Sequence, residues 1–228
     1  MKKIVVFSGS GISAESGIKT FRDSDGLWEQ YRIEDVATPQ AWERNPELVL
    51  DFYNQRRRQV ISAKPNAAHL AIAELQKKFE VQVITQNVDD LHERAGSKNV
   101  LHLHGEIRKS RSSINPFLVY DIDGTELNLG DTCALGSQLR PHIVWFGEQV
   151  PMMEVAADLT ATAHIFIVVG TSLQVYPAAS LVSHAPFDAA MYLIDPQAVT
   201  IPYLPNIKII QEKAGTGVPD LVNILMKS

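Results

Sequence analysis

Short apolar runs alternate with polar, helix-forming segments along most of the chain. Residues 4–7 form a continuous β-branched and aromatic run, and further, mostly apolar runs occur at 81–84, 164–169, 191–194 and 207–210. Continuous apolar residues, rather than alternating ones, are typical of strands that are buried on both faces of a parallel sheet. The helical segments between the runs supply the crossovers that parallel strands need. We therefore predict an α/β fold with a doubly wound, Rossmann-like parallel sheet.

Two segments interrupt this alternation and predict a small subdomain formed by two insertions. The first contains two helix starts, Thr38-Pro39 and Asn45-Pro46, in which a capping residue precedes a proline at the first helical position. The second is rich in serine and glycine and predicts short strands and loops. We expect a single domain over residues 1–228, with a Rossmann core of approximately 1–30, 65–107 and 139–228 and a small subdomain of approximately 31–64 and 108–138.

The helix predicted after Asn45 has an apolar face that includes an arginine. The residues at helical spacing on this face are Val49, Tyr53, Arg56 and Val60. An arginine in an apolar stripe needs an anion or an acceptor to compensate its burial. The pattern alone favours a snorkelling side chain for Arg56, with its stem buried and its charge in water. Arg57 and Arg58 point elsewhere on the helix and are expected to be solvated.

Composition and charge narrow the class of protein. The chain has 228 residues, of which 45% are hydrophobic and 21% charged, as in ordinary globular proteins. Its net charge of −5 argues against a general nucleic-acid-binding surface. The apolar run at residues 4–7 is too short for a signal peptide or a membrane span. We expect a cytoplasmic monomer without nucleic-acid or membrane partners.

Polar or glycine-containing clusters follow several of the predicted strands. They are Gly9, Gln86-Asn87, His104, Thr171-Ser172 and Asp195. In open α/β sheets, ligands bind outside the carboxyl ends of the strands. These clusters should therefore line one crevice, which is the expected place for a nucleotide.

Residues 9–14 match the G-x-G-x-x-G/A pattern of dinucleotide-binding loops. The glycines permit a tight turn, and the helix that follows offers N–H groups to a pyrophosphate. On its own such a match is a weak signal. The second strand with a ribose-binding acid, which an ordinary Rossmann unit would show next, is replaced by a loop rich in turn formers at 20–28.

Taken together, these motifs resemble the sirtuins, which are NAD-dependent protein lysine deacylases. Each matching segment is short, but the segments are spread over nearly the whole chain in the order of the family, and jointly they are very specific. The matching segments are residues 9–13, 16–18, 21–22, 85–89, 91–92, 104–105, 140–141, 144, 146–148, 170–173 and 177–178.

The resemblance implies a cleft between a Rossmann domain and a small domain that holds NAD and an acylated lysine. His104 resembles the general base of the family, Asn87 the residue that positions the nicotinamide ribose, and Asp89 the residue that binds the carboxamide. Phe21 resembles the loop aromatic that screens the reacting sugar carbon, and Arg22 the mobile-loop arginine near the phosphates. His104 and Asn87 are the expected catalytic residues. The further cofactor contacts that we expect are Gly9, Ser10, Gly11, Ile12, Ser13, Gln86, Val88, Gly170, Thr171, Ser172 and Asp195.

On the substrate side, Val144, Phe146 and Gly147 resemble the strand that pairs with the acyl-lysine peptide of a protein substrate. Tyr53 and Arg56 resemble the pair that marks sirtuins preferring malonyl or succinyl lysine. Such acyl groups end in a carboxylate, which a guanidinium can bind bidentately while a phenol donates a further hydrogen bond. The resemblance therefore favours a functional role for Arg56 over the snorkelling interpretation.

The implied reaction gives nicotinamide, free lysine and O-acyl-ADP-ribose. A base must remove a ribose hydroxyl proton, and a histidine such as His104 titrates in the required range. The alternatives on the same fold are plain deacetylation, ADP-ribosyl transfer and NAD hydrolysis. A non-catalytic sensor of NAD or ADP-ribose is disfavoured because His104, Asn87 and Asp89 are all present.

The chain departs from the family pattern at two places. Sirtuins usually carry two Cys-x-x-Cys pairs that hold zinc in the small domain, whereas this chain has only Cys133. His102 and His104 are imaginable ligands, but with one cysteine at most we expect no zinc and a subdomain held by its own packing. The second departure is Ser10, where the family usually has alanine, which leaves the affinity for NAD open.

Overall fold

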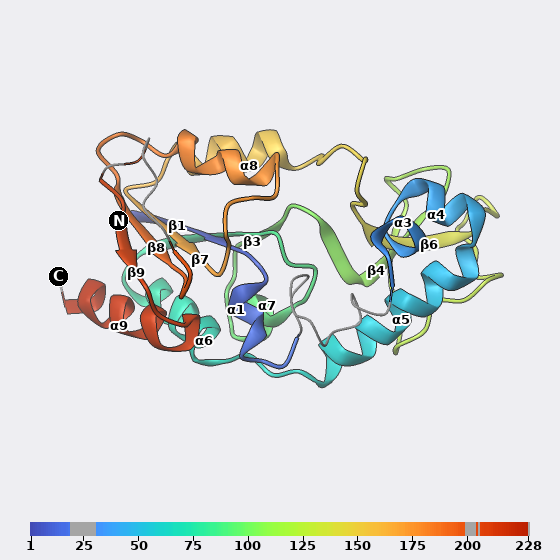
Figure 1. Ribbon diagram of the computed structural model, residues 1–228, viewed down its shortest axis with the longest axis horizontal. Helices are drawn as coiled ribbons and strands as arrows, with labels where there is room; N and C mark the ends of the chain where they lie inside the picture. Colours follow the sequence, from blue (N-terminus) through green and yellow to red (C-terminus); the bar gives the residue numbers. More distant parts are fainter. Residues whose placement is uncertain (19–30, 199–203, 205, 228) are drawn as a thin grey trace.

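The computed structural model describes residues 1–18, 31–198, 204 and 206–227. Its largest element is a six-stranded sheet in the order β3-β2-β1-β7-β8-β9, in which every neighbouring pair of strands is parallel. The chain builds outward from β1 on one side and then crosses over to build outward on the other, so the predicted doubly wound fold is confirmed (Figure 1). The strands are β1 (Lys3–Ser8), β2 (Glu80–Thr85), β3 (Val100–His102), β7 (Ile165–Val169), β8 (Ala190–Ile194) and β9 (Lys208–Ile210).

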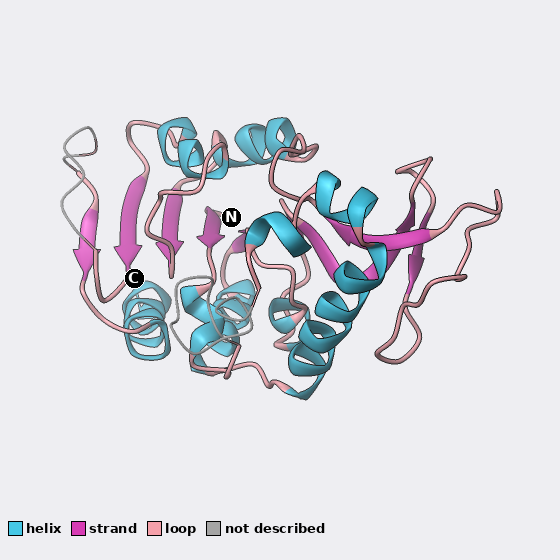
Figure 2. Ribbon diagram, turned by 45° about the vertical axis from the view of Figure 1, so that its right-hand side comes forward, coloured by secondary structure: helices cyan, strands magenta, loops and turns pink. Residues whose placement is uncertain are grey.

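Helices cover both faces of this sheet, and alternate residues of β1 contribute to the two resulting cores. Ile4 and Val6 pack with helices α6 and α9 on one face, and Val5 and Phe7 pack with α8 and η2 on the other (Figures 1 and 2). This explains why the run is continuously apolar. No helix in the described ranges is long and apolar enough to cross a membrane. The helices are α1 (Gly11–Ala14), α6 (Ala67–Glu74), η1 (Leu75–Lys77), α7 (Leu91–Arg94), α8 (Met153–Thr160), η2 (Ala178–His184) and α9 (Ala214–Lys227).

Within the described residues, a smaller unit of three helices and a three-stranded antiparallel sheet lies beside the main sheet (Figure 1). Both predicted helix starts are confirmed, since Thr38 accepts a hydrogen bond from the Ala41 N–H and Asn45 accepts one from the Leu48 N–H. The strand β6, at residues 139–143, pairs with β4 and so belongs to this small sheet. The elements are α3 (Ile33–Val36), α4 (Pro39–Arg44), α5 (Pro46–Ser62), β4 (Gly105–Ser112), β5 (Val119–Asp121) and β6 (Leu139–Ile143).

Arg57 is completely buried, so the expectation that it is solvated is wrong. Its Nε donates to the Ile107 carbonyl at 2.7 Å, and its Nη1 donates to Asn54 Oδ1 at 2.6 Å and to the Thr125 carbonyl at 2.8 Å. The guanidinium therefore joins helix α5 of the first insertion to strand β4 and to the loop after β5. Burial lowers the pKa of Arg57 to about 10, so it stays charged at neutral pH.

Arg58, by contrast, is exposed as expected and pairs with Glu126 at 2.5 Å. Arg57 follows Tyr53 by four residues, so helical spacing places it beside the buried face of α5. Its burial was not evident from the sequence, because the backbone carbonyls that accept from it belong to other elements.

Candidate functional site

The loops after β1 and β7 meet at the point where the strand order reverses. The Gly9 N–H donates to the Val169 carbonyl at 3.0 Å, and the Gly11 N–H donates to the Gly170 carbonyl at 2.8 Å. A Cβ added to Gly9 would lie 2.7 Å from the Gly170 oxygen, and one added to Gly11 would lie 2.8 Å from the Gly170 Cα. The second loop therefore excludes side chains at these two positions, so the backbone of the turn is left uncovered by side chains where a nucleotide would approach.

The side chains of Ser10, Ile12 and Ser13 differ in how deeply they are buried. Ser10 is exposed, whereas the Ile12 side chain is fully buried in the apolar core, so Ile12 can contact a cofactor only through its backbone. Ser13 is buried and its Oγ donates to Asp89 Oδ2 at 3.0 Å.

Asn87 and Asp89 are buried at the end of β2 and are joined to the glycine turn by hydrogen bonds. Asn87 Nδ2 donates to the Gly9 carbonyl and to Ser13 Oγ, each at 3.1 Å. Asp89 Oδ1 accepts from the Leu91 N–H at 3.2 Å. Burial raises the pKa of Asp89, while the hydrogen bonds from Leu91 and Ser13 oppose that rise. Both amide protons of Asn87 are thus used within the protein, which presents its Oδ1 as an acceptor.

His104 lies just beyond β3, and its Nδ1 is 3.0 Å from the Gln86 carbonyl oxygen. A carbonyl can only accept, so Nδ1 carries the proton and Nε2 is left as the basic nitrogen. Burial lowers the pKa of His104, and the bond to Gln86 partly opposes this effect. The ring is therefore neutral at physiological pH. The Gln86 side chain also ties β2 to β7 through a 3.2 Å hydrogen bond to Thr171 Oγ1.

A series of buried, linked polar side chains, which the sequence analysis did not identify, supports the backbone of Asn87. The Asn87 N–H donates to Thr85 Oγ1 at 3.0 Å, and Ser8 Oγ donates to the same oxygen at 2.9 Å. His92 Nε2 lies 2.9 Å from Ser8 Oγ, and the ring of His69 packs edge-on against His92 with centroids 4.9 Å apart. Burial lowers the pKa of both histidines, that of His69 to about 4. Thr85 and His92 lie within the matched motifs. Their position there was the only signal in the sequence for these buried contacts.

Tyr53 and Arg56 lie on α5, on the side of the small subdomain that carries Trp145. The Tyr53 oxygen accepts a hydrogen bond from Trp145 Nε1 at 3.1 Å, and burial raises the pKa of Tyr53 to about 12. Arg56 is half-buried. Burial lowers the pKa of Arg56, and the proximity of Tyr53 and Asp89 opposes that shift. The charges of Arg56 and Asp89 thus interact.

The segment 144–147, expected as a strand, is a turn instead. Strand β6 ends at Ile143, the Glu148 N–H bonds back to the Trp145 carbonyl at 3.0 Å, and Gly147 has a φ of +89°. Glu148 stabilises this turn by accepting from the Trp145 N–H at 2.8 Å and from Arg140. Val144 donates its N–H to the His104 carbonyl at 2.9 Å, while the Phe146 side chain is 49% exposed.

The remaining expected site residues lie farther from this centre or outside the described residues. Ser172 is exposed at the rim beyond β7, and the Val88 carbonyl accepts from the Ile107 N–H. Asp195 follows β8, two strands from β1, and its Oδ1 accepts from the Gln197 N–H at 2.8 Å. It is therefore not brought into contact with Asn87 or His104. Phe21 and Arg22 lie outside the described residues.

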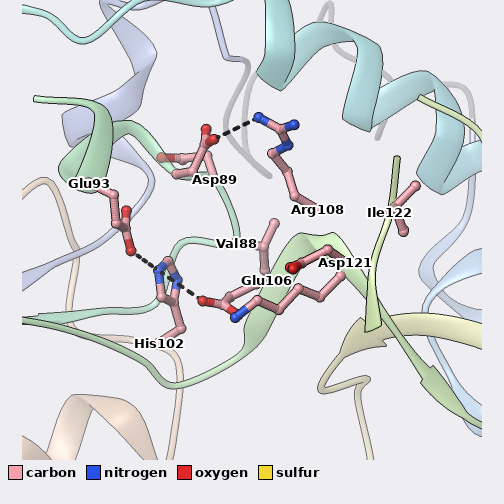
Figure 3. Close-up of a pocket in the computed structure, with 10 residues that line it drawn as sticks. Val88, Asp89, Glu93, His102, Glu106, Arg108, Asp121 and Ile122 are labelled. Atoms are coloured by element: carbon pink, nitrogen blue, oxygen red, sulfur yellow. Dashed lines mark hydrogen bonds and ion pairs between the residues drawn. The ribbon is translucent and has the colours of Figure 1, made fainter. Parts of the chain in front are cut away.

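Cys133 is buried and contacts two hydroxyl groups rather than other metal-binding side chains. Its Sγ lies 3.1 Å from Ser137 Oγ and 3.4 Å from Ser112 Oγ. In the part of the chain that the structure describes, the group with metal-binding potential is Glu93, His102 and Glu106. These three side chains lie together at one edge of a pocket (Figure 3).

Comparison with known proteins gives consistent matches over the whole chain. Residues 9–177 match the model of the Sir2 family. An NAD-dependent protein deacylase of Helicobacter pylori is 56% identical over 227 residues, covering 100% of this chain and 99% of the relative. One of Bacteroides thetaiotaomicron is 49% identical, covering 99% of each chain.

Solved structures agree with this picture. A Sir2 homologue in complex with NAD is 42% identical and superimposes with a TM-score of 0.88, covering 99% of this chain and 90% of the other. A Sir2 variant with one histidine replaced by alanine, solved with a deacetylated p53 peptide and 3′-O-acetyl ADP-ribose, is 30% identical with a TM-score of 0.78, covering 98% and 92%.

Proposed function

The chain belongs to the Sir2 family and is an NAD-dependent protein deacylase, and we propose that it prefers lysines whose acyl group ends in a carboxylate, such as malonyl and succinyl lysine. The family membership confirms the resemblance drawn from the motifs. The proposed preference rests on one observation, that Arg56 follows Tyr53 by three residues on α5 and interacts with it electrostatically.

The chemistry of this pair suits a carboxylate. Arg56 is partly desolvated, and a desolvated cation gains from a nearby anion. The Tyr53 oxygen already accepts from Trp145, so the phenol proton is directed elsewhere and can be donated to an acyl carboxylate. Because the pKa of Tyr53 is about 12, the phenol stays protonated throughout the physiological range. Malonyl and succinyl groups offer this anion, whereas an acetyl group offers none.

The residues at the strand ends fit a dinucleotide, since the turn at Gly9 and Gly11 has no room for side chains and its backbone can be approached closely. When bound, NAD supplies the electrophilic ribose carbon and the nicotinamide leaving group. We propose that the 9–13 turn holds the phosphates, that Asn87 orients the nicotinamide ribose, and that Asp89 binds the carboxamide.

We propose that His104 accepts the proton of a ribose hydroxyl at its Nε2. Its Nδ1–H bond to the Gln86 carbonyl fixes the ring orientation and the tautomer, and its lowered pKa keeps Nε2 unprotonated near neutrality. Removal of this proton makes the sugar oxygen able to attack the acyl carbon, which leads to O-acyl-ADP-ribose and free lysine.

We also propose that the small subdomain is held without zinc. Buried hydrogen bonds from Arg57 join its two insertions, and Cys133 is engaged by Ser112 and Ser137. These contacts would hold the parts of the subdomain together, as a tetrahedral metal site would otherwise do.

The test of the acyl preference compares one peptide sequence carrying acetyl, malonyl or succinyl lysine, with product masses recorded. We expect Arg56→Met to lower kcat/KM for the malonyl and succinyl peptides by about ten- to a hundredfold, the worth of a charge-assisted hydrogen bond, and to change acetyl turnover little. Arg58→Met is the matched control, since Arg58 lies on the same helix, is exposed and pairs with Glu126.

Three outcomes would contradict these proposals. Succinyl turnover that survives Arg56→Met would remove the acid-binding role. A wild-type kcat/KM that is highest for the acetyl peptide would indicate a plain deacetylase, and equal values for all three peptides would remove the proposed preference. Nicotinamide release without O-acyl-ADP-ribose would point to ADP-ribosyl transfer or NAD hydrolysis.

A further inference from the structure

We propose that Glu93, His102 and Glu106, none of which is a proposed cofactor contact, form a binding site for a divalent first-row transition-metal ion that does not involve Cys133. The three residues come from helix α7, from the last position of β3 and from the second position of β4. Figure 3 shows both carboxyl groups directed toward the His102 ring. His102 Nε2 lies 2.7 Å from Glu93 Oε1 and 4.0 Å from Glu106 Oε1.

The orientation of His102 is the one that a metal ligand requires. Its Nδ1 lies 2.9 Å from the Asn87 carbonyl oxygen, which can only accept, so Nδ1 carries a proton and Nε2 faces the two carboxyl groups. Nε2 donates to Glu93, and a metal ion would bind there by replacing this proton. Histidines that bind metals commonly donate their second ring nitrogen to a backbone carbonyl in this way. The His102 side chain is only 7% exposed, so its ring is already held in place.

The spacing of the three side chains fits one ion. The candidate ligand atoms all lie within 4.8 Å of one another. Ligands that are about 2.1 Å from a shared ion lie roughly 3.0–4.2 Å apart, so the three side chains need to move by about half an ångström or less to reach that range. The other oxygen of Glu106 is paired with Lys109, which turns Oε1 toward His102.

The surroundings favour a cation and leave room for water ligands. The pocket has a volume of about 260 Å³ and is lined by five carboxyl groups, those of Asp89, Asp90, Glu93, Glu106 and Asp121, against two basic side chains. Both basic side chains are engaged, Arg108 by Asp90 at 3.3 Å and Lys109 by Glu106.

One imidazole with two carboxylates is a donor set that suits Zn²⁺, Mn²⁺ or Co²⁺ better than Ca²⁺ or Mg²⁺, which take oxygen ligands. A bound ion would tie α7 and β3 of the main sheet to β4 of the small subdomain. It would also fix the backbone of Asn87 through His102.

The test is a titration of the purified full-length chain with Co²⁺, followed by visible absorption, and with Zn²⁺, followed by calorimetry. We expect one ion per chain, and we expect His102→Asn and Glu106→Gln each to weaken binding by about tenfold or more. His184→Asn is the matched control because His184 is exposed at the end of η2. Cys133→Ser should bind as tightly as the wild-type chain.

Circular dichroism of each variant without metal checks that the variants are folded. Equal affinity in the wild-type chain and His102→Asn would overturn the proposal. So would the absence of binding at millimolar Zn²⁺, which would leave Glu93 and His102 as an ion pair. Loss of binding in Cys133→Ser would assign the ion to the thiol instead.

Discussion

At His104, the position of one proton decides what the side chain can do. The Gln86 carbonyl takes the Nδ1–H, so the basic lone pair is on Nε2. The same reasoning applies to Tyr53, where the bond from Trp145 decides where the phenol proton points. In both cases the residue type was evident in the sequence, whereas the direction of its hydrogen bond depends on a partner far away in the chain.

The lowered pKa of His104 predicts the pH dependence of turnover. Because burial disfavours the imidazolium, the basic form persists below the ordinary histidine pKa of about 6.5, and the acid limb of kcat/KM should lie below that value. A profile of kcat/KM for an acyl peptide between about pH 5 and pH 8 measures this limb. His104→Ala should lose about a hundred- to ten-thousandfold in kcat.

His184→Asn, which alters an exposed histidine, should keep the wild-type profile. An acid limb at or above pH 6.5 in the wild-type enzyme would contradict the proposed environment of His104.

Helix α5 performs two tasks with neighbouring residues. One side carries Tyr53 and Arg56 toward the proposed acyl site, and Arg57 faces the small sheet and is buried there. The order of Arg56, Arg57 and Arg58 in the sequence does not reveal this division, because each successive residue turns by about 100° and only the surrounding elements decide which arginine is enclosed.

Replacement of Arg57 by methionine should destabilise the protein strongly. The change leaves the Ile107 and Thr125 carbonyls without their buried donor, and each unsatisfied group costs about 1–3 kcal/mol. Asn54 Oδ1 also loses its bond from Arg57 but keeps the one from the Leu127 N–H. We expect the free energy of unfolding, measured by urea denaturation, to fall by about 3 kcal/mol or more. Arg58→Met should change it by less than about 0.5 kcal/mol, because Arg58 is exposed. Similar losses in the two variants would show that the buried contacts of Arg57 contribute little.

Across the whole molecule, a pair of buried neutral histidines links α6 and α7 behind the site. His69 caps α6, with its Nδ1 accepting from the Asn66 N–H at 3.3 Å, and packs against His92, which contacts Ser8 of β1. Burial lowers the pKa of each, so both disfavour a proton in the folded state. The fold is therefore coupled to pH through groups outside the proposed chemistry.

This coupling predicts a loss of stability in mild acid. Below about pH 6.5 the unfolded chain takes up protons on these histidines, whereas folded His69 does not until about pH 4, so the free energy of unfolding falls as pH falls through this window. At pH 5, His69 alone accounts for a decrease of about 2 kcal/mol in the free energy of unfolding. Urea denaturation at about pH 7 and pH 5 measures the difference.

His69→Gln retains a capping side chain at the third position of α6 and should reduce this pH dependence, while His184→Asn should keep it. An unchanged slope in His69→Gln would assign the acid sensitivity to other groups.

The sequence by itself determined the strands, the helix starts and the edge at which polar residues gather. These features follow from local rules, namely burial of both faces of a parallel strand, capping of helix ends, and the meeting of all carboxyl ends at one edge of a parallel sheet. The chain order of the motifs was also sufficient to indicate the family, which the comparisons confirm.

The tertiary structure alone decided the burial of Arg57, the pairing of β6 with β4, the turn at 144–147 and the meeting of Glu93 with His102 and Glu106. Each of these depends on partners that are brought together only when the chain folds, such as Arg57 with the Thr125 carbonyl 68 residues away. A local pattern specifies which face of an element is apolar, but the acceptor that satisfies a buried charge comes from another element.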